Sequence, residues 1–149
     1  MEMNLAVIWA GLAIGLAGVG VALGQSNLAH TSVDILGRNP KLSSTLMVYT
    51  ILGIALVESA AIYALVVAFK IMAVADTIDP ANAIAAGLAI GLTGMGAGYG
   101  QWKLVSHSLE SVNRNPRNKG QVMQFMVLFL ALIETIAIYG LIIAFQLLG

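Results

Sequence analysis

Two glutamates interrupt long apolar segments of this 149-residue sequence. Glu58 and Glu134 each lie near the middle of a run of aliphatic and aromatic residues. A charged side chain at the centre of a bilayer costs at least about 2.5–3.5 kcal/mol on insertion scales, so such residues usually mark ion or proton pathways. The simpler alternative is a protonated carboxyl that only hydrogen-bonds neighbouring helices. Two acids at matching places favour reversible ion binding.

Each glutamate is accompanied by the same polar residues. A hydroxyl residue follows it directly (Ser59, Thr135), and a tyrosine stands five residues after it (Tyr63, Tyr139). Hydroxyl and tyrosine are four residues apart and therefore share one face of a helix. A glutamine also precedes each glutamate at the same separation in the sequence.

These glutamines, Gln25 and Gln101, precede a loop arginine, and the glutamates follow that arginine at a greater separation. At 1.5 Å per residue in a helix, the arginine is about 20 Å from the glutamine and about 30 Å from the glutamate. Side-chain length, helix tilt and the turn must close the difference if the residues are to meet.

The elements that must position these residues are four apolar stretches. Hydrophobic residues make up 59% of the sequence and charged residues 9%, the mean hydropathy is +0.91, and there is no cysteine. The stretches cover residues 4–30, 43–72, 82–106 and 121–148, separated by polar breaks at 34–44, 76–82 and 110–121. Each is long enough to cross about 30 Å of hydrocarbon as a helix. We therefore predict an all-α, multi-pass membrane protein, and we exclude a soluble enzyme, thiolate chemistry and nucleic-acid binding.

The sequence repeats itself without a gap at an offset of 76. Of the 73 aligned positions 28 are identical, including Glu58 with Glu134 and Gln25 with Gln101. We expect two tandem helical hairpins, residues 1–73 and 82–149, joined by an external linker at 74–81. The first helix of each hairpin is rich in glycine, which allows close backbone packing and favours an inner layer. The second helices carry larger side chains, as expected of an outer layer in a two-layered ring.

Charge asymmetry predicts the orientation. Basic residues gather in or near the first and third breaks, whereas Glu2, Asp76 and Asp79 lie near the N-terminus and in the middle break. By the positive-inside rule the first and third breaks are cytoplasmic and both termini lie outside. We expect His30 and His107 to be interfacial rather than metal-binding.

With its glycine-rich first helices, polar Arg-Asn-Pro turns and central glutamates, the chain resembles the c subunit (proteolipid) of rotary ATP synthases. The resemblance implies a homo-oligomeric rotor ring in membrane lipid, expected in a bacterial inner membrane. It also implies a non-catalytic subunit without a cofactor, which carries ions past a stator a subunit and couples their flow to ATP synthesis or hydrolysis. The turns that would dock the central-stalk subunits are Arg38-Asn39-Pro40 and Arg114-Asn115-Pro116.

The transported ion is expected to be Na⁺. A proton needs only a carboxyl, whereas Na⁺, like other hard cations, needs several oxygen donors, and sodium-binding members of the family have a similar donor set. The expected ligands are Gln25, Leu56, Glu58, Ser59, Tyr63, Gln101, Leu132, Glu134, Thr135 and Tyr139. Family geometry places the hydroxyl and the carbonyl of a site on the neighbouring outer helix. One glutamate should therefore use donors of its own chain and the other those of the next chain.

Three alternatives remain open. The same ring could translocate H⁺. A small multidrug-type exporter also has four helices and an intramembrane glutamate, but it does not require a duplicated Gln/Glu/Tyr set. A purely structural or fusion-pore proteolipid would tolerate loss of both glutamates.

Overall fold

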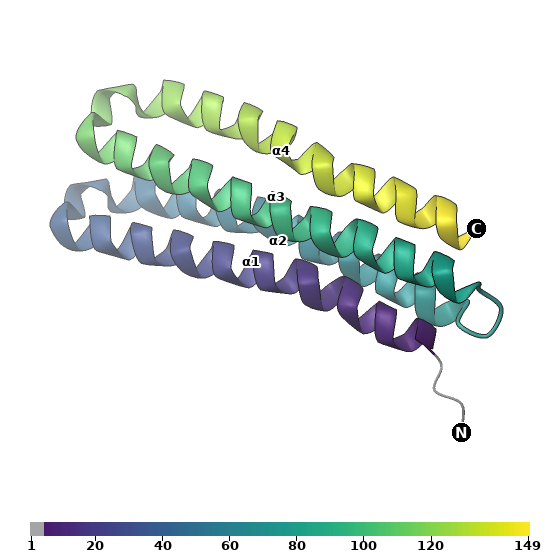
Figure 1. Ribbon diagram of the computed structural model, residues 1–149. Helices are drawn as coiled ribbons and strands as arrows, with labels where there is room; N and C mark the ends of the chain where they lie inside the picture. The colour runs from purple at the N-terminus through teal and green to yellow at the C-terminus, as the bar shows by residue number, and fades with distance from the viewer. Residues whose placement is uncertain (1–4) are drawn as a thin grey trace.

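A computed structural model describes residues 5–149 of the chain, of Leu5 only the backbone, and shows four long helices (Figure 1). They are α1 (Leu5–Arg38), α2 (Ser43–Ala73), α3 (Pro80–Arg114) and α4 (Lys119–Leu148), with short 3₁₀ helices at Pro40–Leu42 and Pro116–Asn118. Glu2, used above to orient the chain, lies outside the described residues. All four helices are long and apolar enough to cross a membrane, which confirms the all-α fold with four membrane-spanning helices.

The first helix of each hairpin is longer than its apolar stretch. α1 continues through Asp34 to Arg38, and α3 continues through Glu110 to Arg114. A basic residue in the last turn interacts favourably with the helix dipole, and Arg38 pairs with Asp34 one turn earlier. Each helix stops just before the proline of its Arg-Asn-Pro turn, because proline disfavours helical conformation in the preceding residue.

The helices form two antiparallel hairpins lying side by side, with the two Arg-Asn-Pro turns at one end and the α2–α3 connection and C-terminus at the other (Figure 1). The N-cap of α3 is Asp79, whose carboxylate accepts a hydrogen bond from the Ala81 amide at 2.8 Å, with Pro80 in the first turn. This cap and proline define where the second hairpin begins.

Glycines hold α1 and α3 together. A β-carbon at Gly20 would lie 2.5 Å from the Met95 Cα, and one at Gly98 would lie 3.0 Å from the Gly20 carbonyl carbon. The two backbones are therefore in direct contact, as small residues permit in membrane helices.

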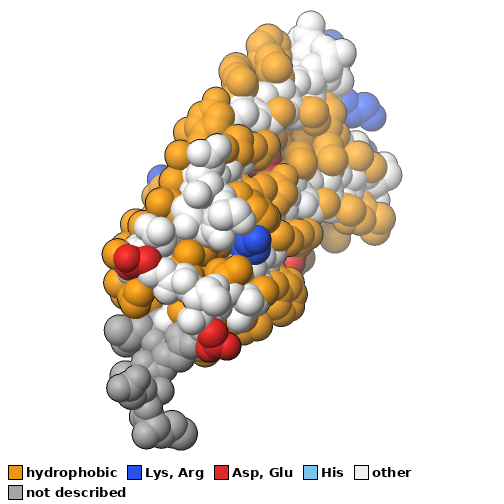
Figure 2. Space-filling model, turned by 90° about the vertical axis from the view of Figure 1, so that its right-hand side faces the viewer, with side chains coloured by type: hydrophobic (Ala, Val, Ile, Leu, Met, Phe, Trp, Pro, Cys, Tyr) orange, Lys and Arg blue, Asp and Glu red, His pale blue; other side chains and the backbone are white. Residues whose placement is uncertain are grey.

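The outer surface is strongly apolar. Seen from the end that carries the C-terminus, hydrophobic side chains cover most of the visible flanks and charged groups are few (Figure 2). Exposed residues include Phe69 on α2 and Phe125 and Phe145 on α4. So much exposed apolar surface fits contact with lipid or with further copies.

Candidate ion-binding site

Glu134 lies in a polar site midway along the bundle. It is 7% exposed, and the fully buried Gln101 of α3 donates from Nε2 to Glu134 Oε2 at 2.6 Å. These two residues belong to the second hairpin, and their pairing across α3 and α4 encloses the carboxylate.

The first hairpin completes this site. Ser59 Oγ of α2 lies 2.5 Å from Glu134 Oε1 and 2.5 Å from the Leu56 carbonyl oxygen. Tyr63, one turn further along α2, also approaches the carboxyl group of Glu134 and Ser59. Because Ser59 has a single hydroxyl proton, it can donate to only one of its two oxygen neighbours at a time. Side chains from α2, α3 and α4 thus converge on the Glu134 carboxylate.

One oxygen of this site has no partner. The Gln101 side-chain oxygen is buried and accepts no hydrogen bond from any described residue. A buried acceptor without a partner is destabilising by about 1–3 kcal/mol. Donor and acceptor ends of this amide therefore differ sharply, since its nitrogen is bonded and its oxygen is free to coordinate.

The equivalent residues around Glu58 are only half assembled. Gln25 Nε2 donates to Glu58 Oε2, but Glu58 is exposed. Thr135 hydrogen-bonds the Leu132 carbonyl at 2.7 Å, and Leu132 and Tyr139 are 57% and 58% exposed on α4. The chain therefore contains one closed set of candidate ligands and the two separate parts of another.

The turn explains how glutamine and glutamate meet. The segment from Asn39 to Leu42 crosses between the helices, and α2 begins at Ser43. At 1.5 Å per residue, Glu58 lies about 22 Å from the start of α2 and Gln25 about 20 Å from the end of α1. Glu58 and Gln25 therefore lie at nearly the same distance from the turn. The difference of about 10 Å that results when both distances are counted from Arg38 disappears, because the turn residues do not belong to α2.

The six turn residues lie at one end of the molecule. Asn39 Nδ2 donates to Asn113 Oδ1 at 3.3 Å, which connects the two turns. Arg38 pairs with Asp34, and Arg114 donates to Ser111 Oγ at 3.2 Å. Asn113 was not singled out from the sequence, because it has glycine as its repeat counterpart and no motif marks it.

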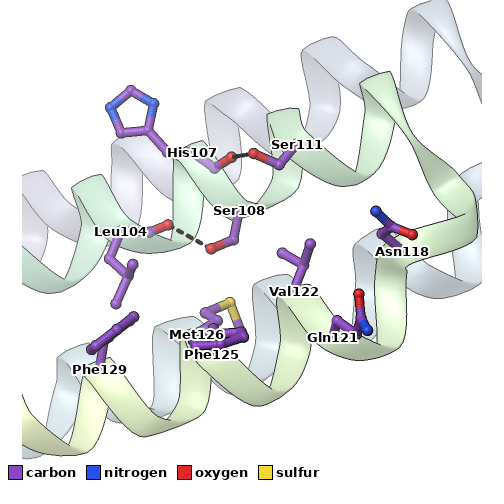
Figure 3. A pocket seen from close by; sticks show the side chains of 10 residues that line it. All are labelled: Leu104, His107, Ser108, Ser111, Asn118, Gln121, Val122, Phe125, Met126 and Phe129. Carbon is purple, nitrogen blue, oxygen red and sulfur yellow. Dashed lines mark hydrogen bonds between the residues drawn. The ribbon is translucent and has the colours of Figure 1, made fainter.

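A groove runs between α3 and α4 on the exposed side of the second hairpin (Figure 3). Its lining includes Leu104, Val122 and Phe125, which correspond in the repeat alignment to Leu28, Leu46 and Tyr49. Those three counterparts are buried in the core shared by the two hairpins, and the Tyr49 hydroxyl donates to the Lys119 carbonyl. The groove on the second hairpin is thus equivalent in the repeat to the surface of the first hairpin that packs against the second, but no part of the described chain covers it.

Some known proteins resemble almost the whole chain and others about half of it. The chain is 36% identical over 144 residues to A-type ATP synthase subunit K of Methanocaldococcus jannaschii, an alignment covering 97% of this chain and 61% of that protein. The chloroplastic ATP synthase c subunits of Antithamnion sp. and Gracilaria tenuistipitata var. liui are each 41% identical over 71 residues, 48% of this chain and 87% of theirs. The chain therefore spans about three fifths of the length of the archaeal relative and about twice the aligned length of the chloroplast relatives.

The pattern of the ATP synthase C subunit family matches twice, at residues 8–71 and 84–147. These ranges correspond to the two hairpins and leave only the ends and the connection unmatched. The protein is a member of the ATP synthase C subunit family, with the family's domain present in duplicate.

Proposed function

We propose that this chain is a rotor-ring subunit of a rotary ATP synthase and carries Na⁺ at Glu134 and Glu58. The proposal draws on the family membership and on the relative named as A-type ATP synthase subunit K. In this role the chain has no ATP site of its own and transports its ion by binding and releasing it.

The unpartnered oxygen of Gln101 is the observation that carries the choice of Na⁺. It is buried beside Glu134, whose other oxygen neighbour is Ser59. With the Leu56 carbonyl these groups form an oxygen-only donor set of the kind that hard cations prefer. A cation held beside Glu134 would give the amide oxygen a partner in its present orientation, whereas a proton on the carboxyl would do so only if the amide turned around.

The second site is completed by an adjacent copy of the chain. Ser59 and Glu134 belong to different repeats, and in the repeat alignment they correspond to Thr135 and Glu58. If the contact between the hairpins recurs between copies, Thr135 of one chain therefore meets Glu58 of the next. Thr135 and Tyr139 lie on one hairpin, where Tyr139 is exposed, and Glu58 lies exposed with its glutamine on the other. Each chain would therefore enclose one ion by itself and share a second with its neighbour.

The groove between α3 and α4 receives the adjacent copy. Its repeat counterpart in the first hairpin is already covered by the second hairpin. If the second hairpin of each chain packs in the same way on the first hairpin of the next chain, every chain uses two different surfaces. This is a heterologous assembly, which can close into a ring. This arrangement gives the inner layer to α1 and α3 and the outer layer to α2 and α4.

Coupling follows from the cost of exposing a charge to lipid. An unneutralised carboxylate is strongly disfavoured in hydrocarbon, so a site must hold a cation before it leaves the stator a subunit. An arginine of that subunit would favour the empty, anionic form. The Arg-Asn-Pro turns would lie in the cytoplasm and dock the central-stalk subunits, with both termini on the other side of the membrane.

Carbodiimide labelling of the purified complex tests this function. We expect both Glu58 and Glu134 to react at neutral pH, and NaCl but not KCl to protect both. E58Q and E134Q each remove one labelled site, and the double variant should abolish ion transport while leaving the ring intact.

Three results would contradict the proposal in different ways. Labelling that is equal in NaCl and KCl would make the ring a proton carrier. A monodisperse assembly of only two chains would favour a small exporter. Unchanged activity of the E58Q/E134Q variant would leave only a structural role.

A further inference from the structure

A polar contact joins α1 and α3 near the end of the bundle that carries the two Arg-Asn-Pro turns. The Thr31 hydroxyl of α1 lies 3.2 Å from the Ser106 hydroxyl of α3. Ser106 is 6% exposed, so this contact belongs to the packed junction between the two hairpins.

The same junction recurs between copies, with different residues. In the repeat alignment Thr31 corresponds to His107 and Ser106 corresponds to His30. If adjacent copies pack as the two hairpins of one chain do, His107 of one copy faces His30 of the next. We infer that His107 and Glu110 of one chain, with His30 of the next, form a binding site for a borderline dication such as Zn²⁺ at each junction between copies. This inference rests on the proposed ring. It replaces the expectation from the sequence that the two histidines do not bind metal, because the Thr31–Ser106 contact indicates that they meet across a junction between copies.

The spacing suits two imidazoles that share a metal ion. Each hydroxyl oxygen of the Thr31–Ser106 pair is one bond from its β-carbon, so the β-carbons lie no further apart than the roughly 5–6 Å typical of residues four apart on a helix. Two histidines at that separation bind zinc in the HExxH motif. Imidazole nitrogen is a preferred donor for Zn²⁺.

The single chain leaves these side chains available. His30 and His107 are both exposed, and the His107 ring points away from α4 (Figure 3). No group of three or more potential His, Cys, Asp or Glu ligands occurs within the described part of one chain. The site therefore requires two copies.

Carboxylates accompany both histidines. Glu110 Oε2 lies 3.5 Å from His107 Nδ1 and 3.9 Å from Arg114 Nη1. Its repeat counterpart Asp34 stands one turn after His30 but pairs with Arg38. Glu110 is thus the better placed third ligand, and its charge would offset part of that of the dication.

Cysteine cross-linking tests the junction without metal. The natural chain has no cysteine, so H30C/H107C introduces the only two thiols. We expect oxidation to produce a ladder of linked chains on denaturing gels. T31C/S106C, the matched control, should form its bond within one chain and produce no ladder.

Zinc binding to the intact, purified ring tests the site itself. We expect one Zn²⁺ per chain by elemental analysis after dialysis, and at least a tenfold weaker affinity in H30Q and in H107Q. K103Q, an exposed change one turn before His107, should bind zinc normally. E110Q should bind zinc more weakly than K103Q.

The outcomes separate the two proposals. A missing H30C/H107C ladder would overturn both the junction and the site. A ladder together with unchanged zinc binding in H30Q and H107Q would retain the ring and overturn the metal site. An equal loss in K103Q would also overturn it, because the effect would then reflect surface charge.

Discussion

Ser59 of the first hairpin contacts Glu134 of the second at 2.5 Å. The closed polar site in this chain is therefore built across the internal duplication and not within either repeat. Glu58, which has similar neighbours in sequence, has only its own glutamine as a side-chain partner among the described residues.

Removal of the Ser59 hydroxyl should affect ion binding at Glu134, and removal of the Thr135 hydroxyl should affect ion binding at Glu58. We expect S59A to raise the Na⁺ concentration that half-protects Glu134 from carbodiimide and to leave Glu58 unchanged. T135A should do the reverse. A hydrogen bond to a charged group contributes about 1.5–3 kcal/mol, or about a ten- to hundredfold change in affinity. Residue-resolved mass spectrometry of the label measures both sites, and equal effects of S59A on both would contradict the assignment.

The glutamine amides should decide ion selectivity. Q101L removes the donor to Glu134 and the unpartnered oxygen. We expect Na⁺ protection of Glu134 to weaken at least about tenfold, because a charge-assisted hydrogen bond and a cation ligand disappear together. Q25L is the matched variant for Glu58. Sodium-tracer uptake driven by ATP should fall in both, and unaltered uptake in Q101L would exclude this amide as a ligand.

Two equivalent glycines should separate folding of the chain from assembly. G20A forces a methyl group against the Met95 backbone, and overpacking of this kind typically costs about 1–3 kcal/mol. Thermal unfolding of the isolated chain in mild detergent should therefore shift downward. G96A meets open space in the single chain, so it should unfold like the unaltered protein but assemble poorly, as measured by native mass spectrometry.

The Tyr49 hydroxyl should strengthen only the junction within the chain. It donates to the Lys119 carbonyl, and its repeat counterpart Phe125 has no hydroxyl. We expect Y49F to destabilise the isolated chain by about 0.5–1.5 kcal/mol, the usual net value of one hydrogen bond. Circular dichroism melting measures the change. F69L, at a more exposed position of α2, is the control and should melt normally.

Much of the fold could be predicted from the sequence, because apolar length and an ungapped repeat constrain a membrane protein strongly. The helix ends could not. α1 and α3 run through Asp34 and Glu110, since a helix can continue into water when i,i+4 pairs and a C-terminal arginine support it. The first polar residue of these two breaks therefore marks a change of environment, and the helices themselves end later, at Arg38 and Arg114.

For the candidate site, the sequence predicts the types of the ligand residues but not which of them come together in one site. The repeat makes Glu58 and Glu134 look alike, yet only Glu134 is enclosed, because Ser59 of α2 contacts Glu134 and only Gln25 hydrogen-bonds Glu58 among the described side chains. Asn113 and Thr31 were missed because their contacts with Asn39 and Ser106 cross the duplication, where no local spacing reveals them.

The exposed Glu58 has a consequence for how the proposed ring is built. An arc that lacks one member would present this acid at one broken end and its unmatched threonine and tyrosine at the other. The lipid would penalise the first end until a further chain covered it. Rings with a missing member would thus be disfavoured by the same carboxylate that is proposed to carry the ion, and closure would require no separate assembly signal.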